Sequence, residues 1–144
     1  MTASSFGISF WRISRIASDC LSKALAPIEK RYGITSVQAQ LLFGVRQNQD
    51  ATVGLIAEKL GLARTNTSAM CKKLAGMGFL KRSRRKDDER IVSLTLTETG
   101  EEAAEAVEKR IEKLYRKLRI TPGEMESLLY TFTEMSTALV DEEE

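Results

Sequence analysis

Residues 55–80 read LIAEKLGLARTNTSAMCKKLAGMGFL, and residues 81–100 continue with KRSRRKDDERIVSLTLTETG. One short amphipathic helix is predicted over 53–60, and after a turn at Gly61 a second is predicted over 64–77. Two alternating segments follow, 79–83 and 90–96, and these predict the strands of a hairpin with a polar tip. The order helix, turn, helix and basic hairpin is typical of a winged helix-turn-helix, whose second helix enters the major groove of DNA.

The charge is unevenly distributed along the chain, although the formal net charge is only +2. Residues 1–63 carry a net charge of +3, residues 64–92 carry +6 and residues 93–144 carry −7. The positive segment coincides with the second helix and the hairpin, which makes it an electrostatic footprint for a polyanion. The alternative interpretation of such a segment is a solvated charged surface without a partner.

Several classes of function are disfavoured by the composition. The chain has two cysteines, outside any CxxC pair, and no histidine, which excludes His-containing zinc sites and His-based catalytic triads. No phosphate loop, metal cluster or nucleophile–base pair is visible, so we predict no enzyme, no cofactor and no metal site. Neither an apolar run of roughly 20 residues nor a secretory signal is present, which predicts a cytoplasmic protein without membrane contact.

Long amphipathic helices are predicted on both sides of the winged segment. They cover residues 6–31, 97–118 and the segment after Thr121, and their apolar faces exceed what a lobe of residues 35–96 can bury. A second copy of the chain is the simplest partner for the remaining apolar surface, because two-fold dimers are the commonest oligomers.

The predicted fold class is therefore mainly α with a small β-wing: a winged helix-turn-helix core flanked by long N- and C-terminal dimerisation helices. Three segments are expected within a single domain: an N-terminal dimerisation helix over 1–34, a DNA-binding lobe over 35–98, and C-terminal dimerisation helices over 99–144.

The candidate DNA contacts lie on the second helix and in the hairpin. Short polar side chains near the start of a reading helix can reach base edges, and Asn66 suits an adenine edge. Flanking cations suit phosphates, and arginines at the hairpin tip suit the narrow minor groove. The predicted DNA-binding residues are Arg64, Thr65, Asn66, Ser68, Lys72, Lys73, Arg84, Arg85 and Arg90. Asp88 is expected to orient Arg90; the alternative is a surface ion pair of little energetic consequence.

The sequence also resembles the MarR family of winged helix-turn-helix transcriptional regulators. The motifs that carry this resemblance are YGITSVQAQLL at 32–42, LIAEKLGL at 55–62, ARTNTSAMCKKLAGMGFL at 63–80, and DDERIVSLTLTETG at 87–100. The last contains the family's D-x-R element as Asp88–Arg90 and its L-T-x-x-G element as Leu96–Gly100. The resemblance implies a homodimer that binds a pseudo-palindromic site in double-stranded DNA. It also implies a repressor whose affinity for DNA changes when a small molecule binds or an oxidant reacts with it.

Two departures from the family pattern affect the recognition helix. Ala63 stands at the N-cap, where the family often has serine, and losing such a cap costs about 1 kcal/mol. Ala69 replaces a commonly polar or basic residue and offers only a methyl contact.

Three functional hypotheses remain open from the sequence. The first is a regulator released by a small-molecule effector, with Phe10, Trp11, Ile13 and Arg15 as candidate effector-binding residues between the first helix and the lobe; the alternative for their apolar members is plain core or dimer packing. The second is a thiol redox sensor using Cys20 or Cys71. The third is a winged-helix module that binds protein instead of DNA.

Overall fold

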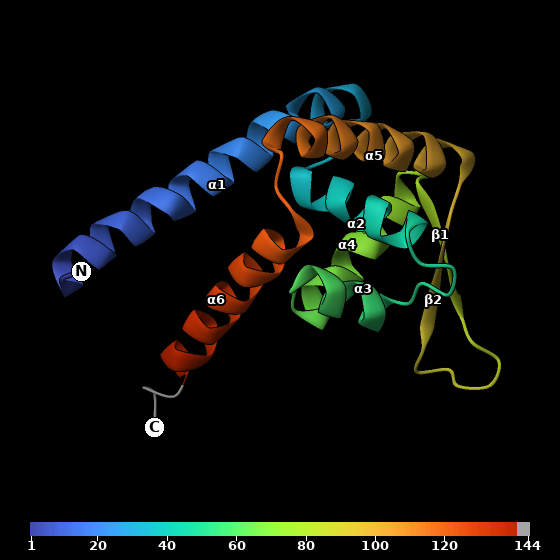
Figure 1. The fold of residues 1–144 in the computed structure, drawn as a ribbon. Helices are drawn as coiled ribbons and strands as arrows, with labels where there is room; N and C mark the ends of the chain where they lie inside the picture. The colour runs from blue at the N-terminus through green and yellow to red at the C-terminus, as the bar shows by residue number, and fades with distance from the viewer. Residues whose placement is uncertain (141–144) are drawn as a thin grey trace. The chain divides into compact units, whose positions relative to one another are not determined.

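The chain is mostly helical with one small antiparallel hairpin, as predicted (Figure 1). The computed structural model describes the backbone of residues 1–140; residues 141–144, the end of the predicted C-terminal segment, lie outside it. In chain order the elements are α1 (Ala3–Tyr32), α2 (Ser36–Arg46), α3 (Val53–Leu60), α4 (Arg64–Gly76), β1 (Leu80–Arg84), β2 (Val92–Leu96), α5 (Glu98–Leu118) and α6 (Pro122–Val140). The chain divides into two compact units, 1–111 and 112–144.

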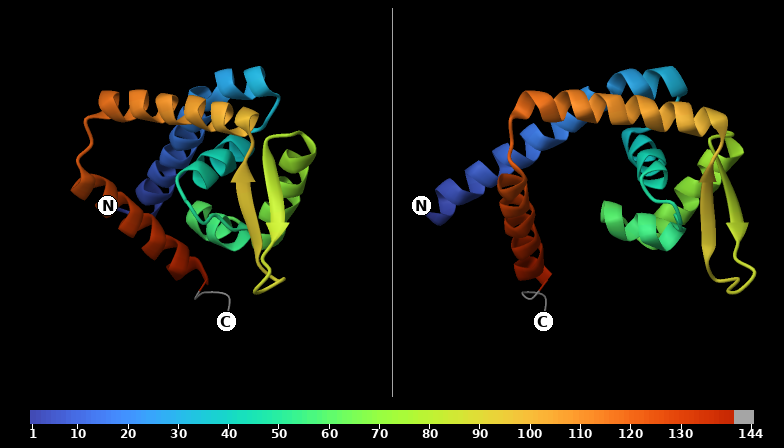
Figure 2. Two further views of the ribbon diagram at one scale, coloured as in Figure 1. Left: turned by 90° about the vertical axis from the view of Figure 1, so that its right-hand side faces the viewer. Right: turned by 45° about the vertical axis from the view of Figure 1, so that its right-hand side comes forward.

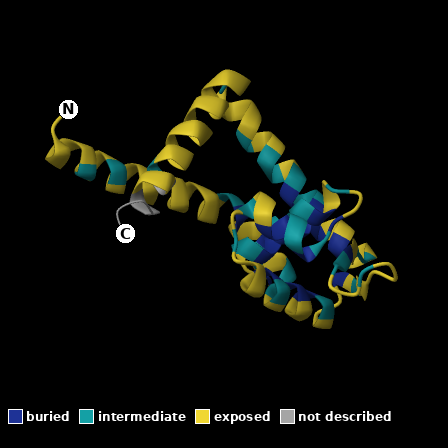
Figure 3. Ribbon diagram, turned by 90° about the horizontal axis from the view of Figure 1, so that it is seen from below, coloured by how far each residue is buried: buried dark blue, intermediate teal, exposed yellow. Residues whose placement is uncertain are grey.

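The hydrophobic core lies in the first unit, where the end of α1, helices α2–α4, the hairpin and the start of α5 meet (Figure 3). Its largest fully buried apolar side chains are Leu25, Leu41, Leu42, Ile56, Leu74 and Val107. Each element presents one apolar face to this core, which is the pattern expected of short amphipathic helices around a single core.

Side-chain caps fix where the helices of the lobe begin. The Thr35 Oγ1 accepts from the Gln38 backbone N–H at 3.3 Å, and the Thr35 N–H donates to Gln38 Oε1 at 2.9 Å. These two contacts form a reciprocal capping box, for which Thr35-Ser36-Val37-Gln38 has the required spacing. Thr52 caps α3 in the simpler way, because its Oγ1 accepts from the Leu55 N–H at 3.1 Å.

The hairpin β1–β2 forms the wing. Leu80 pairs with Leu96 and Arg84 with Val92, so each strand begins one or two residues later than the sequence indicates. The Leu94 N–H donates to the Ala51 carbonyl at 2.9 Å, which ties β2 to the loop that precedes α3. Figure 2 shows the hairpin beside α4, with its tip extending beyond α3 and α4.

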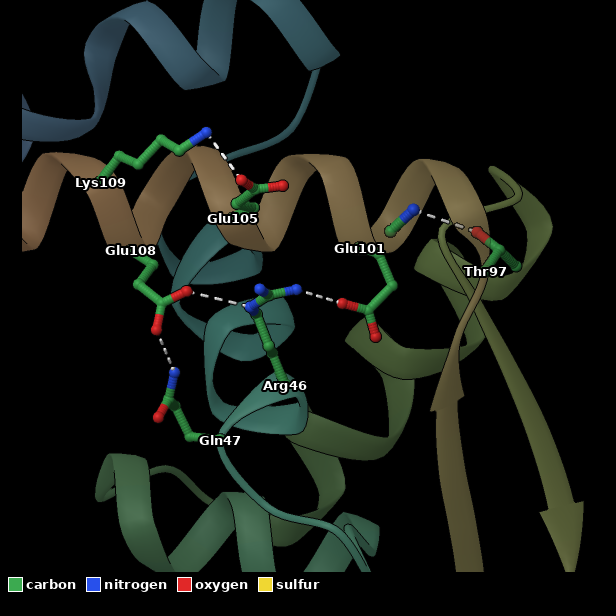
Figure 4. Close-up of polar contacts among 8 residues, drawn as sticks. Arg46, Gln47, Thr97, Glu101, Glu105, Glu108 and Lys109 are labelled. Atoms are coloured by element: carbon green, nitrogen blue, oxygen red, sulfur yellow. Dashed lines mark hydrogen bonds and ion pairs between the residues drawn. The ribbon is translucent and has the colours of Figure 1, made fainter.

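Polar contacts hold α2 against α5 (Figure 4). Arg46 forms ion pairs with both Glu101 and Glu108, its Nε lying 3.1 Å from Glu108 Oε2. Gln47 Nε2 donates to the other Glu108 oxygen at 3.0 Å. These contacts fix the lobe on the first turns of α5 through partners 55 to 62 residues apart in the chain.

The first half of α1 contributes little to the core. Of the apolar stripes predicted on this helix, only Leu25 and Ile28 are buried, while Trp11 is 68 % exposed. In the second unit, the apolar residues Met125, Leu128, Leu129, Tyr130 and Phe132 of α6 are likewise exposed. None of the described helices combines the length and apolar character that a membrane span requires.

Candidate nucleic-acid interface

Helices α3 and α4 form the predicted helix-turn-helix. Gly61 ends α3 with a left-handed φ of 64°, a conformation that costs glycine little. Its N–H donates to the Ala57 and Glu58 carbonyls, and the Leu62 N–H also donates to Ala57. The chain therefore turns within three residues and starts α4 at Arg64.

Helix α4 has one buried face, as its amphipathic sequence pattern predicts. Thr67, Cys71 and Leu74 are fully buried, and the Thr67 hydroxyl donates to the Ala63 carbonyl at 3.1 Å. Among the predicted DNA-binding residues of this helix, Ser68 is half-buried, and the exposed ones are Arg64, Thr65, Asn66, Lys72 and Lys73. The helix thus presents short polar groups at its start and cations along its flanks, which is the set that a reading helix needs.

The exposed residues of α4 do not all lie on the same side of the helix. Asn66, Ala69 and Lys73 line a surface hollow of about 700 Å³ together with Thr35, Val37, Gln38, Leu62 and Met70. The Arg64 guanidinium lies over α3, because a methyl group at Gly54 would be 3.7 Å from Arg64 Cζ. The sequence pattern predicted that these residues lie away from the core. It could not show which of them lie on the flank of α4 beside α2 and which lie on the flank over α3.

The wing tip contains two carboxylate–guanidinium pairs. Arg90 Nε lies 3.1 Å from Asp88 Oδ1, and the same oxygen accepts from the Arg90 N–H at 3.0 Å, so the expected Asp88–Arg90 contact is present. Arg85 forms a two-point contact with Asp87, with Nε–Oδ1 at 3.0 Å and an Nη2–Oδ2 distance of 2.7 Å. Arg84 has a weaker partner, since its Nη1 donates to the neutral Glu89 carbonyl at 3.2 Å.

These pairs shift the ionisation of the tip. The hydrogen bond from Arg85 is the main reason that the pKa of Asp87 lies below its usual value, and Arg90 lowers the pKa of Asp88 in the same way. The pKa of Arg85 is raised, first by the hydrogen bond to Asp87 and then by attraction to Asp87, Asp50 and Asp88. The tip therefore holds fixed, opposite charges at neutral pH.

Most of the net positive charge of residues 64–92 lies on α4 and at the start of β1, and little of it lies at the wing tip. Residues 84–90 contain four cations and three carboxylates, for a net charge of +1. Residues 64–83 contain five further cations, and none of the five enters an ion pair within the described part of the chain: Arg64, Lys72, Lys73, Lys81 and Arg82.

Lys81 and Arg82 were not among the predicted contacts. Lys81 is exposed, whereas Arg82 lies opposite Leu94 with its Nε buried near Cys71. Their place in the basic segment was the available signal for both residues.

The candidate effector residues on α1 do not share one site. Trp11 and Arg15 line a surface hollow of about 380 Å³ with Ile8, Arg12, Ile16 and Asp19. Phe10 is half-buried and stacks on Phe6, with ring centroids 6.2 Å apart, and Ile13 is 52 % exposed. The hollow is formed by α1 alone. Trp11 and Arg15 therefore do not line the expected space between this helix and the lobe.

The missing cap at Ala63 gives a first prediction. Ala63 has the extended backbone of an N-cap, with φ −61° and ψ 133°, but makes no side-chain cap bond. We expect Ala63→Ser to raise the free energy of unfolding by about 1 kcal/mol, since the hydroxyl can accept from the N–H of Asn66. Urea unfolding followed by circular dichroism measures this change. Ala69→Ser adds the same hydroxyl in mid-helix and is expected to give no gain; an equal gain from both would rule out capping as the cause.

Comparisons with known proteins agree with this arrangement. A family model described as transcriptional regulator SarA/Rot matches residues 23–107. The HTH-type transcriptional regulator YfiV of Bacillus subtilis (strain 168) is 32% identical over 104 residues, which are 71% of this chain and 65% of YfiV.

Two solved structures extend the comparison. The crystal structure of overoxidized AbfR bound to DNA is similar, with 28% identity, a TM-score of 0.65, and coverage of 96% of this chain and 93% of AbfR. A MarR/EmrR family transcriptional regulator from Acinetobacter sp. ADP1 shares the fold, with 20% identity, a TM-score of 0.70, and coverage of 98% of this chain and 99% of that one.

Proposed function

This chain belongs to the SarA/Rot family of transcriptional regulators, a MarR-type winged helix family, and we propose that it is a homodimeric repressor of sequence-specific type. In this proposal it binds a pseudo-palindromic operator in duplex DNA, and a small-molecule effector releases it. The observation that carries the proposal is the exposed polar and cationic surface of α4, on which neither Lys72 nor Lys73 enters an ion pair with a described residue.

The proposed binding mode assigns one groove to each part of the lobe. Helix α4 enters the major groove, where Thr65, Asn66 and Ser68 face base edges and Arg64, Lys72 and Lys73 face phosphates. The wing reaches the adjacent minor groove with Arg84 and Arg85, and Asp88 orients Arg90 toward the phosphate backbone. Asp88 accepts from both the backbone N–H and the guanidinium of Arg90, which supports its role in orienting this residue.

The dimer is proposed from the uncovered apolar surface. Phe6, Ile8 and Trp11 on α1 are each about half exposed or more, and so are Leu128 and Leu129 on α6. Groups of exposed large apolar side chains on both helices are uncommon on a soluble monomer, and a second copy would bury them. The domain boundaries at 34 and 98 follow from the same proposal, since they separate the helices that meet the partner from the lobe that meets DNA.

The redox alternative depends on Cys20. Cys71 is fully buried, and burial raises the pKa of its thiol to about 11, which leaves almost no thiolate at neutral pH. Cys20 is exposed on α1. Peroxide added to the binding assay described below separates the two proposals: operator affinity that is unchanged removes the redox alternative.

The protein-interaction alternative is tested by salt. Affinity for duplex DNA that rests on phosphate contacts falls steeply as salt is added. No duplex binding, or a flat response to salt, would favour a partner protein over DNA.

The binding assay also tests the assigned roles. After selection of the operator from a random duplex pool, we expect Asn66→Ala to weaken the operator by about tenfold or more and random duplex much less, because Asn66 reads a base. Arg90→Ala is expected to weaken both duplexes alike and to flatten the salt slope by about 0.9 per protomer, because Arg90 meets a phosphate. Equal losses on operator and random duplex for Asn66→Ala would contradict its base-reading role.

A further inference from the structure

We propose that Asp87 restrains Arg85 in the DNA-free protein and thereby sets how much this arginine adds to DNA affinity. The carboxylate occupies the Nε and Nη2 edge of the guanidinium, one of its two edges for a two-point contact with a phosphate, at distances of 3.0 and 2.7 Å. This inference rests on the proposed DNA binding and adds to it a residue that lowers affinity.

The surroundings of Arg85 hold its side chain against the lobe and do not direct it toward DNA. Its side chain lines a polar hollow of about 490 Å³ with residues of the α2–α3 loop and of β2, among them Asp50, Thr52 and Ser93. Asp50 and Asp88 also attract the guanidinium, so three carboxylates act on this one cation. The side chain is therefore directed toward the body of the lobe and is already neutralised there.

The two neighbouring arginines provide the contrast. The Arg84 guanidinium has only a neutral carbonyl as its described partner, and Arg90 is 91 % exposed although it contacts Asp88. Arg85 is 46 % exposed and makes the shortest contacts of the three. Arg90 contacts Asp88 through the same two nitrogens, Nε and Nη2, but at the longer distances of 3.1 and 3.4 Å. Arg84 and Arg90 can therefore reach a phosphate more readily than Arg85, which must first leave the closer contact with Asp87.

The partner of Arg85, either the Asp87 carboxylate or a phosphate, affects how steeply DNA affinity falls as salt is added. While Arg85 stays paired with Asp87, it contacts no phosphate and releases no cation from the DNA. If position 87 is uncharged, Arg85 is free to contact a phosphate, and this contact adds a slope of about 0.9 to the salt dependence of binding.

The experiment compares Asp87→Asn with Glu89→Gln in the full-length protein. Both variants remove one negative charge from the tip, but the Glu89 side chain has no described ion-pair partner, so only the first frees an arginine. We expect Asp87→Asn to tighten binding to operator and random duplex by about two- to fivefold per wing, the range for loss of an exposed ion pair. The salt slope should steepen by about 0.9 per wing. Glu89→Gln should change both quantities much less.

The same comparison in an Arg85→Ala background isolates the arginine. There, Asp87→Asn should gain no more than Glu89→Gln does. An equal gain from the two variants in the natural background overturns the inference, and so does no gain from Asp87→Asn. A loss of affinity would show the opposite role, in which Asp87 presents Arg85 to DNA. Absence of any duplex binding by the natural protein would overturn the proposed function together with this inference.

Discussion

Replacing Gly100 with alanine is expected to destabilise the winged lobe by about 3 kcal/mol or more, because the added methyl group has no space. A Cβ at this position would lie 1.8 Å from the Phe79 carbonyl oxygen and 2.9 Å from its carbon. Both atoms belong to the backbone, so the clash cannot be relieved by a side-chain rotation. Helix α5 would have to move away from the start of the wing.

Movement of α5 would also break a group of hydrogen bonds. The Thr97 N–H donates to the Phe79 carbonyl at 3.1 Å, and the Thr97 hydroxyl donates to the Gly78 carbonyl at 2.6 Å. The same hydroxyl accepts from the Gly100 N–H at 3.1 Å, which caps α5. Thr97 and Gly100 together explain why a Leu-Thr-x-x-Gly element follows the wing: the threonine starts the helix and the glycine lets it touch the backbone of residue 79.

Urea unfolding at a fixed protein concentration measures the effect, since the stability of an oligomer depends on concentration. Gly76→Ala is the matched control, because a Cβ at Gly76 meets nothing within 4 Å. Alanine is the better helix former, so this control should be neutral or slightly stabilising. A cost below about 1 kcal/mol for Gly100→Ala would mean that α5 can shift freely and that the close contact is not important for stability.

The local features of the fold could be predicted from the sequence because each depends on residues close together in the chain. The capping box of Thr35 and Gln38, the turn at Gly61 and the buried side of α4 all follow from spacing alone. The same is true of Thr121, whose hydroxyl accepts from the Glu124 N–H at 3.3 Å.

Contacts between residues far apart in the chain could not be predicted from the periodicity of the sequence. Arg46 meets Glu101 and Glu108 across 55 and 62 residues, and no pattern in one segment identifies a partner in another. Gly100 could be recognised as part of a motif, but the reason for glycine is the position of Phe79, which only the packed structure supplies.

For the candidate site, the sequence predicts how much positive charge is present, but it does not predict which of the cations have carboxylate partners. A count along the sequence finds the basic segment, but it treats Arg85 and Arg90 as equivalent to Lys72 and Lys73. The structure separates them, since the two arginines each have a carboxylate partner and the two lysines have none within the described residues. The lysines are therefore expected to dominate the phosphate contacts.

Replacing Lys72 and Lys73 together with glutamine is accordingly expected to cause a large loss of DNA affinity. The proposed homodimer would lose the four cations that we assign to phosphates, and each phosphate contact contributes about 0.9 to the slope of log affinity against log salt. The slope should flatten by roughly 3 to 4, and affinity at 0.15 M salt should fall by about 100- to 1,000-fold. Operator and random duplex should lose affinity by similar factors, because phosphate contacts carry no sequence information.

The control for this variant is the pair Lys23→Gln and Lys30→Gln on α1, which removes the same charge from exposed positions outside the basic segment. At 0.15 M salt, charges beyond about 8 Å from DNA are largely screened, so this pair should reduce affinity only a few-fold. A loss as large as that of the α4 pair would mean that net charge, and not contact by α4, drives binding. A loss confined to the operator with an unchanged salt slope would instead assign the two lysines to base edges, because only base contacts distinguish one duplex from another.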